Sequence, residues 1–324
     1  MKRYITPFRF RFSIQLIFTL FCVYVGVRFA VFLAWAAGQS VGIVAKPGAV
    51  EGFLPISALL GFRNLVQTGE WDVIHPAGLT IFIAVMVMCF LFRKGFCGYV
   101  CPVGFVSNLL ERAGRRLNLA VIPNKWIDYP LMSIKYVVFG FFLYTVLFGM
   151  DFRSVRSFLT SPYNMVADAK MLAFFTDPTA LSLVILFSLA LLSLVVRNFW
   201  CRYLCPYGAL LGILAWFGPV AIKRNTITCI DCGQCTQVCP SGIRVQDKRI
   251  VRSPECLGCA ECIDHCPVND CLSFSAYRRF AVPWMAVGIG AVAVLLGFYA
   301  WGVMTGHWDS QMPTLMIRKM YGSL

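Results

Sequence analysis

The chain alternates long apolar runs with shorter stretches that carry most of its charged residues. Five of the runs reach the roughly 17 to 25 residues that a helix needs to cross a bilayer. They cover residues 12–37, 76–92, 130–150, 179–196 and 280–304. This pattern predicts an all-α polytopic membrane protein with about five transmembrane helices.

Two further apolar stretches are predicted not to cross. Residues 52–62 are too short to span and are expected to pack at the membrane interface. Residues 206–222 are almost long enough, but their glycines and an internal Pro219 favour an interfacial segment. The predicted organisation is a membrane domain with four spans at 1–222, a polar domain at 223–279, a fifth span at 280–304 and an extracytoplasmic tail at 305–324.

Composition and charge agree with a membrane protein. Of the 324 residues, 59% are hydrophobic and 14% are charged, whereas soluble proteins are about half apolar and about a quarter charged. The net charge of +14 comes from basic residues at the ends of apolar runs rather than on one polar face, so we predict no nucleic-acid binding. These residues crowd the N-terminus and the stretches 93–125 and 197–279. The positive-inside rule therefore predicts a multi-pass protein of the bacterial inner membrane, with its N-terminus and polar domain in the cytoplasm.

The motif C-x-Y-x-C-P-x-G occurs twice, at 97–104 and at 201–208. Each copy follows an apolar run, a cation and an aromatic residue, so the first four spans are predicted to form two related helical hairpins. Sites in repeat membrane proteins tend to lie where the halves meet. If each motif is α-helical, its two cysteines lie on one face, a turn apart. The thiols concerned are Cys97, Cys101, Cys201 and Cys205.

The polar domain carries the strongest chemical signal, the run C-x2-C-x2-C-x3-C-P, which occurs twice. Three closely spaced thiolates suit three corners of a [4Fe–4S] cubane, and the fourth cysteine of each run is directed to the other cluster. Zinc sites use pairs of cysteines, and a cytoplasmic location disfavours disulfides. We therefore expect a small α+β domain of the bacterial 2[4Fe–4S] ferredoxin type. The predicted ligands are Cys229, Cys232, Cys235 and Cys266 for cluster 1, and Cys256, Cys259, Cys262 and Cys239 for cluster 2.

Two membrane-adjacent C-x3-C-P motifs followed by a double-cubane segment resemble the polyferredoxin-type membrane proteins of the NapH, NosR and CcoG group, and NapH-like members most of all. The resemblance covers about residues 76–275. It implies electron transfer between the membrane quinone pool, iron–sulfur clusters and partner redox proteins such as ferredoxin-like or cytochrome subunits. The CcoG-like members imply an alternative, an assembly factor that reduces a metal ion or a thiol for a respiratory metalloenzyme.

Three interpretations of the four motif thiols stay open. They converge into a third metal or iron–sulfur centre, they cycle through disulfides as redox-active thiols, or they belong to a packed, repeated turn. Three other cysteines are interpreted as small packing residues, two of them inside spans and one outside the ligand run. These are Cys22, Cys89 and Cys271.

No motif marks a quinone site. His75 and His307 fall at the predicted outer ends of spans, and a histidine that titrates near neutral pH is able to accept a quinol proton. The simpler interpretation is that each marks the membrane interface. Arg28 lies inside the first span, where snorkelling explains it at least as well as a quinone contact. The Gly- and Pro-rich loop 46–75 is the first place where we expect a docking surface or a quinol pocket.

Overall fold

The computed structural model describes residues 6–39, 44–121, 123–277 and 279–322. The chain divides into two compact units, and each is described by itself. Unit 1 comprises Met1–Thr19, Val85–Phe139 and Leu186–Val294, and unit 2 comprises Leu20–Ala84, Gly140–Ile185 and Leu295–Leu324.

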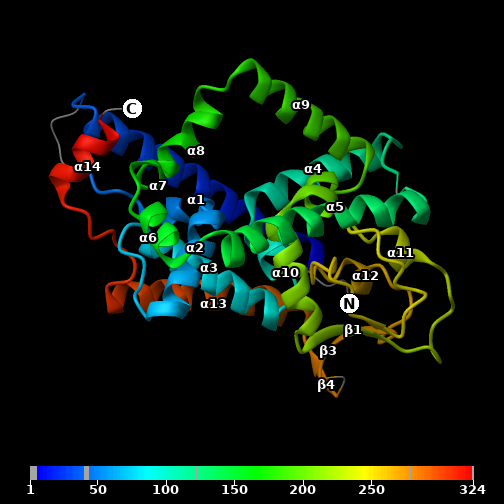
Figure 1. The fold of residues 1–324 in the computed structure, drawn as a ribbon. Coiled ribbons are helices and arrows are strands. Elements are labelled where there is room, and N and C mark those ends of the chain that lie inside the picture. Colours follow the sequence, from blue (N-terminus) through cyan, green and yellow to red (C-terminus); the bar gives the residue numbers. More distant parts are fainter. Residues whose placement is uncertain (1–5, 40–43, 122, 278, 323–324) are drawn as a thin grey trace. The chain divides into compact units, whose positions relative to one another are not determined.

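Each of the five predicted apolar runs forms a helix (Figure 1). Within the described part of the chain, three helices are long and apolar enough to cross a bilayer: α1 (Pro7–Ala36), α5 (Lys125–Tyr144) with its π-helical extension η3 (Thr145–Gly149), and α13 (Trp284–Thr305). A fourth candidate is the pair α8 (Ala167–Thr176) and α9 (Ala180–Val195), which bend by 75°. Helix α3 (Pro76–Leu91) has 16 residues and is shorter than a usual span. Length and apolar composition thus support three to four spans.

The boundaries between the two units all fall inside helices. The chain passes from one unit to the other five times, within α1, α3, α5, α9 and α13. No loop carries the chain across. The five predicted runs are therefore the segments that connect the units.

The core of unit 2 contains a group of aromatic side chains. Phe29 and Phe32 of α1 are fully buried and stack with their ring centroids 5.7 Å apart. Tyr321 meets Phe32 edge-on at 5.3 Å. Residues 52–62, predicted not to cross, lie in η1 and the 14-residue helix α2. The smaller helices of this unit are η1 (Gly48–Phe53), α2 (Pro55–Thr68), α6 (Phe152–Leu159), α7 (Pro162–Met165) and α14 (Thr314–Tyr321).

The polar domain of unit 1 is built on a small antiparallel sheet (Figure 1). Its strands are β1 (Val220–Arg224), β2 (Ile250–Val251), β3 (Leu272–Ala276) and β4 (Phe280–Val282), in the order β2-β1-β3-β4. Ile222 of β1 pairs with Phe274 of β3, and both side chains are buried. Two single-turn helices, α11 (Gln234–Gln237) and α12 (Glu261–Asp264), each follow a cysteine-bearing loop.

The observed sheet differs from two of the predicted boundaries, the start of the polar domain and the start of the last span. Strand β1 begins three residues before position 223, and β4 occupies the first residues of the predicted last span. Helix α13 begins only at Trp284. Hydrophobicity alone does not separate an apolar edge strand from the start of an apolar helix. For this reason the sequence analysis assigned strand β4 and helix α13 to one span. Residues 206–222 form the 12-residue helix α10 (Pro206–Phe217) and part of β1, so they do not form one helix long enough to span.

Both C-x-Y-x-C-P-x-G motifs adopt the same backbone turn. The turns are π-helical rather than α-helical, η2 (Phe96–Val100) and η4 (Trp200–Leu204). In each copy the N–H of the second cysteine donates to the carbonyl oxygen five residues earlier, at 2.9 Å, and this cysteine is the N-cap of the following helix. Pro at the first position of α4 (Pro102–Arg116) and of α10 suits a helix start, because its missing N–H would have no partner there. The condition of an α-helical motif, under which the two cysteines would lie one turn apart on one face, is therefore not met.

A glycine in the first π-helical turn allows two backbone segments to touch. A Cβ atom placed on Gly98 would lie 2.5 Å from the carbonyl oxygen of Leu257, closer than side chains approach a backbone oxygen. We predict that Gly98→Ala lowers the free energy of unfolding by about 1–3 kcal/mol, the usual cost of overpacking. The measurement is thermal unfolding of the detergent-purified protein.

The matched control is Gly26→Ala in α1, where an added Cβ would meet no atom within 4 Å. Alanine at this helical position is expected to leave stability unchanged or to raise it slightly. Equal melting temperatures for the two variants would contradict the close approach at Gly98.

Candidate metal centres

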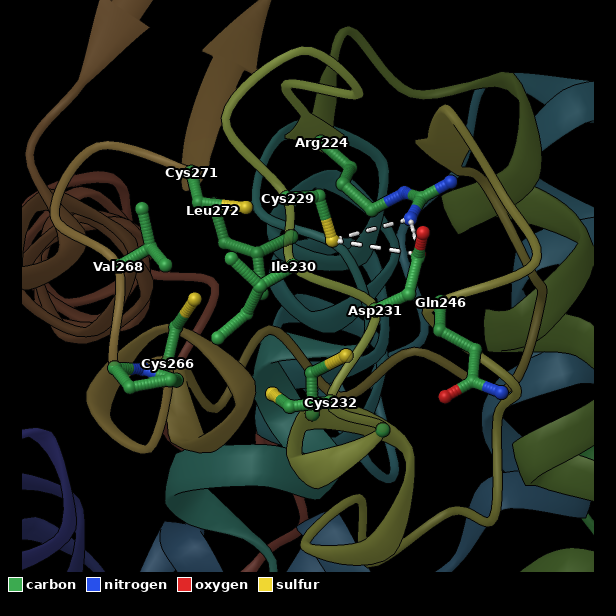
Figure 2. A pocket seen from close by; sticks show the side chains of 13 residues that line it. Arg224, Cys229, Ile230, Asp231, Cys232, Gln246, Cys266, Val268, Cys271 and Leu272 are labelled. Carbon is green, nitrogen blue, oxygen red and sulfur yellow. Dashed lines mark hydrogen bonds and ion pairs between the residues drawn. The ribbon is translucent and has the colours of Figure 1, made fainter.

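The first of two cysteine-lined cavities lies in the polar domain and has an empty volume of about 350 Å³, part of which is open to solvent. Cys229, Cys232 and Cys266 approach it from two loops, and Figure 2 shows their sulfur atoms around the same space. Cys235 lines the same cavity from α11. The loop before α11 turns sharply because Gly233 adopts a positive φ of 74°. All four residues predicted as ligands of cluster 1 therefore line one cavity.

Two further side chains at this cavity escaped the sequence analysis. Arg224 of β1 donates to the sulfur of Cys229 at 3.2 Å and to a carboxylate oxygen of Asp231 at 2.9 Å (Figure 2). Cys271 lines the cavity too, although it was predicted to be an ordinary packing residue. Its thiol lies 3.7 Å from the carbonyl oxygen of Asn225, to which it donates, and burial raises its pKa to about 11. Cys271 is thus a neutral thiol beside the predicted ligands.

The second cavity encloses about 340 Å³ and is lined by the four cysteines predicted for cluster 2. Most of the remaining wall is apolar. Burial raises the pKa of Cys259 to about 12, although the nearby guanidinium of Arg11 lowers it. Free thiols here are neutral, whereas iron ligation displaces their protons. The cysteines are Cys239, Cys256, Cys259 and Cys262, and the apolar wall comes from Ile222, Ile243, Val245, Val251 and Leu257.

Both cavities fit a cubane better than a single metal ion. Among the residues that the structure describes, no three His, Cys, Asp or Glu side chains are placed as ligands of one ion. In a [4Fe–4S] cluster each thiolate binds a different iron, so four sulfur atoms surround a volume rather than a point. The first cavity, lined by five cysteines, and the second, lined by four, have that arrangement.

The first repeat holds the loop that carries the cysteine triplet of the second cavity. The Tyr99 hydroxyl donates to the carbonyl oxygen of Gly258 at 3.0 Å. Arg93, which is fully buried, donates to the carbonyl oxygen of Ser253. These bonds satisfy carbonyl groups of an irregular buried loop that would otherwise lack partners.

The second repeat holds the loop that carries the remaining cysteine, Cys239. The side-chain amide of Asn198 donates to the carbonyl oxygen of Pro240 at 2.8 Å, and Arg202 donates to that of Ser241. Side chains of both repeats therefore form hydrogen bonds to the backbone segments that carry the predicted ligands of the second cavity.

Buried ion pairs connect the helices with the polar domain and with the second repeat. Arg202 also pairs with Asp128 of α5, with an N–O distance of 2.6 Å. Glu261, at the start of α12, pairs with Arg11 of α1 at 2.8 Å and with Arg112 of α4 at 2.7 Å. Because removing one partner of a buried pair leaves an uncompensated charge, these pairs strongly favour one arrangement of the helices around the polar domain.

The four cysteines of the two repeats also lie together in unit 1. Burial raises the pKa of Cys97 to about 11, and Cys205 raises it further. Burial likewise raises the pKa of Cys201 to about 12, with added contributions from Cys205 and Cys97. The two copies of the turn also meet directly, since the rings of Phe96 and Tyr207 lie edge-on with their centroids 5.9 Å apart.

Two of the three candidates for a quinone site, His75 and His307, make separate contacts in unit 2. His75 is buried between Glu51, whose carboxylate lies 3.2 Å from Nδ1, and the carbonyl oxygen of Asn164, 2.7 Å from Nε2. His307 stacks on the indole ring of Trp301, with their centroids 5.3 Å apart.

The network around His75 also includes ionised groups from the loop 46–75 and from α8. Lys46 bridges Glu51 at 2.9 Å and Asp168 at 2.7 Å, and the hydroxyl of Tyr321 donates to Asp168. These groups satisfy one another in a buried core, which indicates a structural role for the network. Arg28 is exposed on α1.

The sheet domain with its thiol-lined cavities, together with the long apolar helices, defines a membrane-bound iron–sulfur protein. The family described as "4Fe-4S dicluster domain" matches residues 221–267, which contain the ferredoxin-type cysteines. The family described as "4Fe-4S binding domain" matches residues 74–119 and 178–225, which contain the two repeats.

Curated proteins extend the match over nearly the whole chain. "Putative electron transport protein YccM" of Escherichia coli is 34% identical over 319 residues, covering 96% of this chain and 89% of that protein. "Ferredoxin-type protein NapH" of Haemophilus influenzae is 27% identical over 258 residues, covering 74% and 84%. "Protein NirI" of Paracoccus denitrificans is 27% identical over 232 residues, which cover 68% of this chain and 32% of NirI. No solved structure matches. The chain belongs to the NapH-like polyferredoxin family of membrane proteins and is an iron–sulfur electron-transfer protein.

The environment of His75 predicts a pH dependence of stability. Both ring nitrogens face oxygen acceptors, so the imidazolium form satisfies both contacts. Burial lowers the pKa of His75, but the hydrogen bond and the charge of Glu51 outweigh burial and raise it. The stabilisation is therefore complete below the unfolded value of about 6.5 and is lost as pH rises through the higher folded pKa.

We predict that His75→Gln lowers the free energy of unfolding by about 1.5–3 kcal/mol at pH 6. The difference from the wild type should shrink towards pH 9, as measured by thermal unfolding in detergent. The control His307→Gln removes a histidine that stacks on Trp301 and should keep the wild-type pH profile. A constant difference between wild type and His75→Gln across this range would show that His75 is neutral in the fold.

Proposed function

We propose that the protein passes electrons between the membrane quinone pool and partner redox proteins through two [4Fe–4S] clusters. The observation that carries this proposal is the pair of cavities, each lined by the four cysteines of one predicted ligand set, in a chain with long apolar helices. Bound clusters would supply one-electron carriers. The proposed ligands are Cys229, Cys232, Cys235 and Cys266 at the first cavity, and Cys239, Cys256, Cys259 and Cys262 at the second.

The contacts of the two cavities suggest separate roles. Both repeats fasten loops of the second cavity to the ends of apolar helices, which favours electron exchange with the membrane side. At the first cavity Cys232 is exposed, and so is its neighbour Ile230, at 65%. A partner redox protein therefore has access to the first cavity, and we assign docking to that end.

The membrane topology is also a proposal. We propose that α1, α3, α5, α9 and α13 each cross the bilayer, since the chain passes between the two compact units inside these five helices. The stretches 92–129 and 196–283, which are rich in Lys and Arg, then lie in the cytoplasm of an inner-membrane protein. The tail after Thr305 lies on the other side.

Quinol is the proposed donor, or quinone the acceptor, because it is the mobile two-electron carrier of the lipid phase. Oxidation of a quinol releases two electrons and two protons. Each cluster accepts a single electron, so the electrons leave one at a time for a partner protein and the protons pass to water. In the opposite direction, reduction of a quinone to quinol takes up two electrons and two protons.

The test uses the anaerobically purified protein in liposomes. We predict that a short-chain quinol analogue reduces the bound clusters, or that the matching quinone oxidises them, as followed by visible absorption and electron paramagnetic resonance. Cys232→Ser should lose about four irons per chain, since one cubane loses a ligand. The control Cys22→Ser, outside all the cysteine sets, should keep the wild-type iron content.

Intact clusters that respond to neither quinol nor quinone would overturn the quinone assignment. A strain that lacks the gene separates the remaining functions. Loss of respiration on one substrate supports electron transfer to a partner, whereas loss of an assembled oxidase favours the reductive assembly factor.

A further inference from the structure

The first cavity is lined by five cysteines, one more than a [4Fe–4S] cluster binds. The described lining of the second cavity includes four. The additional residue of the first cavity is Cys271, which lies outside both ligand runs, since the second run ends at Cys266. The match to the dicluster family also ends before it, at residue 267. The first cavity thus has one thiol in excess of the four that a cluster would use.

The sheet holds Cys271 at the wall of this cavity. Cys271 directly precedes β3, and its carbonyl oxygen accepts a hydrogen bond of 2.8 Å from the N–H of Asn225, the residue after β1. Its own N–H donates to the carbonyl oxygen of Val268 at 3.4 Å. Cys271 is only 2% exposed. Its thiol is therefore kept beside the predicted ligands by backbone bonds and is shielded from bulk water.

Cys266 is the predicted ligand that shares a stretch of chain with Cys271. Figure 2 shows the two residues on one loop at one side of the cavity, with Cys232 on the other side. Cys229 also lies near Cys271, but Arg224 donates to its sulfur at 3.2 Å and fixes its position. Cys266 and Cys271 are therefore placed to reach the same corner of a cluster.

The loop that carries Cys266 is more open than the loop that carries Cys239, its counterpart at the second cavity. Cys239 is buried, and the side chains of Asn198 and Arg202 hydrogen-bond to the two residues that follow it. The loop around Cys266 is exposed at positions 265, 267, 269 and 270. Exposed loops of this kind open locally at a low cost in free energy. A bond between iron and Cys266 is accordingly the one that such an opening would break.

We propose that Cys271 is an alternative ligand for the iron that Cys266 binds, so that either thiol completes the cluster of the first cavity. This inference rests on the proposed function, which places a cubane there. In the exchange the Fe–S bond to Cys266 breaks, a bond to Cys271 forms, and the proton of the Cys271 thiol passes to the sulfur of Cys266. No electron moves, so the cluster keeps its charge and its oxidation state. The exchange retains the cluster at the end of the protein that is open to a partner.

The test is the iron and acid-labile sulfide content of the anaerobically purified full-length protein. We expect Cys266→Ala to keep as much iron as the wild type, because Cys271 takes the vacant place. Cys266→Ala/Cys271→Ala should lose about four irons per chain, the content of one cubane. The matched control is Cys239→Ala, which removes the corresponding ligand of the second cavity. This control should also lose about four irons, since the described lining there includes only the four cysteines of the ligand set.

Equal losses of iron from Cys266→Ala and Cys239→Ala would overturn the exchange and leave the proposed function intact. A wild type without iron would overturn both.

A second test retains all eight predicted ligands and decides the question even if Cys266→Ala does not fold. With an excess of a ferrous-iron chelator, Cys271→Ala should release about four of its irons several-fold faster than the wild type, because Cys271 no longer recaptures iron that Cys266 has released. The control Cys89→Ala truncates another buried cysteine, outside both cavities, and should release iron at the wild-type rate. Equal rates for Cys271→Ala and Cys89→Ala would contradict the proposal.

Discussion

The arrangement of the polar domain depends on hydrogen bonds from buried side chains to the carbonyl oxygens of its cysteine loops. Such loops contain little regular structure, so their backbone groups need partners from elsewhere. Arg93 and Tyr99 supply them from one repeat, and Asn198 and Arg202 from the other. The ferredoxin-type domain is therefore an integral part of unit 1 rather than a tethered module. Fixed loops matter for electron transfer, since the carriers need a constant separation.

The two cysteine runs were open to prediction because their spacing is local in sequence. Three cysteines at C-x2-C-x2-C spacing can surround one cubane whatever the rest of the chain does. The apolar runs were equally visible, and each forms a helix close to its predicted bounds. Features that depend on distant partners were not visible. Cys271 joins the first cavity only because β3 pairs with β1, and β4 forms only as the edge of that sheet.

The π-helical turns show a different limit of sequence analysis. Spacing alone suggested an α-helical pair of cysteines. In the structure the proline after the second cysteine starts a new helix, so the preceding turn ends with a bond between residues five apart. The two copies share this turn, because they share the Cys, Pro and Gly positions that produce it. Similarly, His75 looked like a candidate for proton transfer, but its ring lies within a packed core, with a carboxylate oxygen of Glu51 3.2 Å from Nδ1 and the carbonyl oxygen of Asn164 2.7 Å from Nε2.

The two repeats use one backbone shape for different contacts, and the position after the first cysteine shows how. In the first copy this is Gly98, which lets the carbonyl oxygen of Leu257 approach and itself accepts a hydrogen bond from Arg11. In the second copy it is Arg202, whose side chain reaches Asp128 and a loop carbonyl. A duplicated turn thus keeps its cysteines in equivalent places while the intervening residue is free to change. The two copies share two cysteines, a tyrosine, a proline and a glycine, and the cysteines are the metal-binding side chains among them.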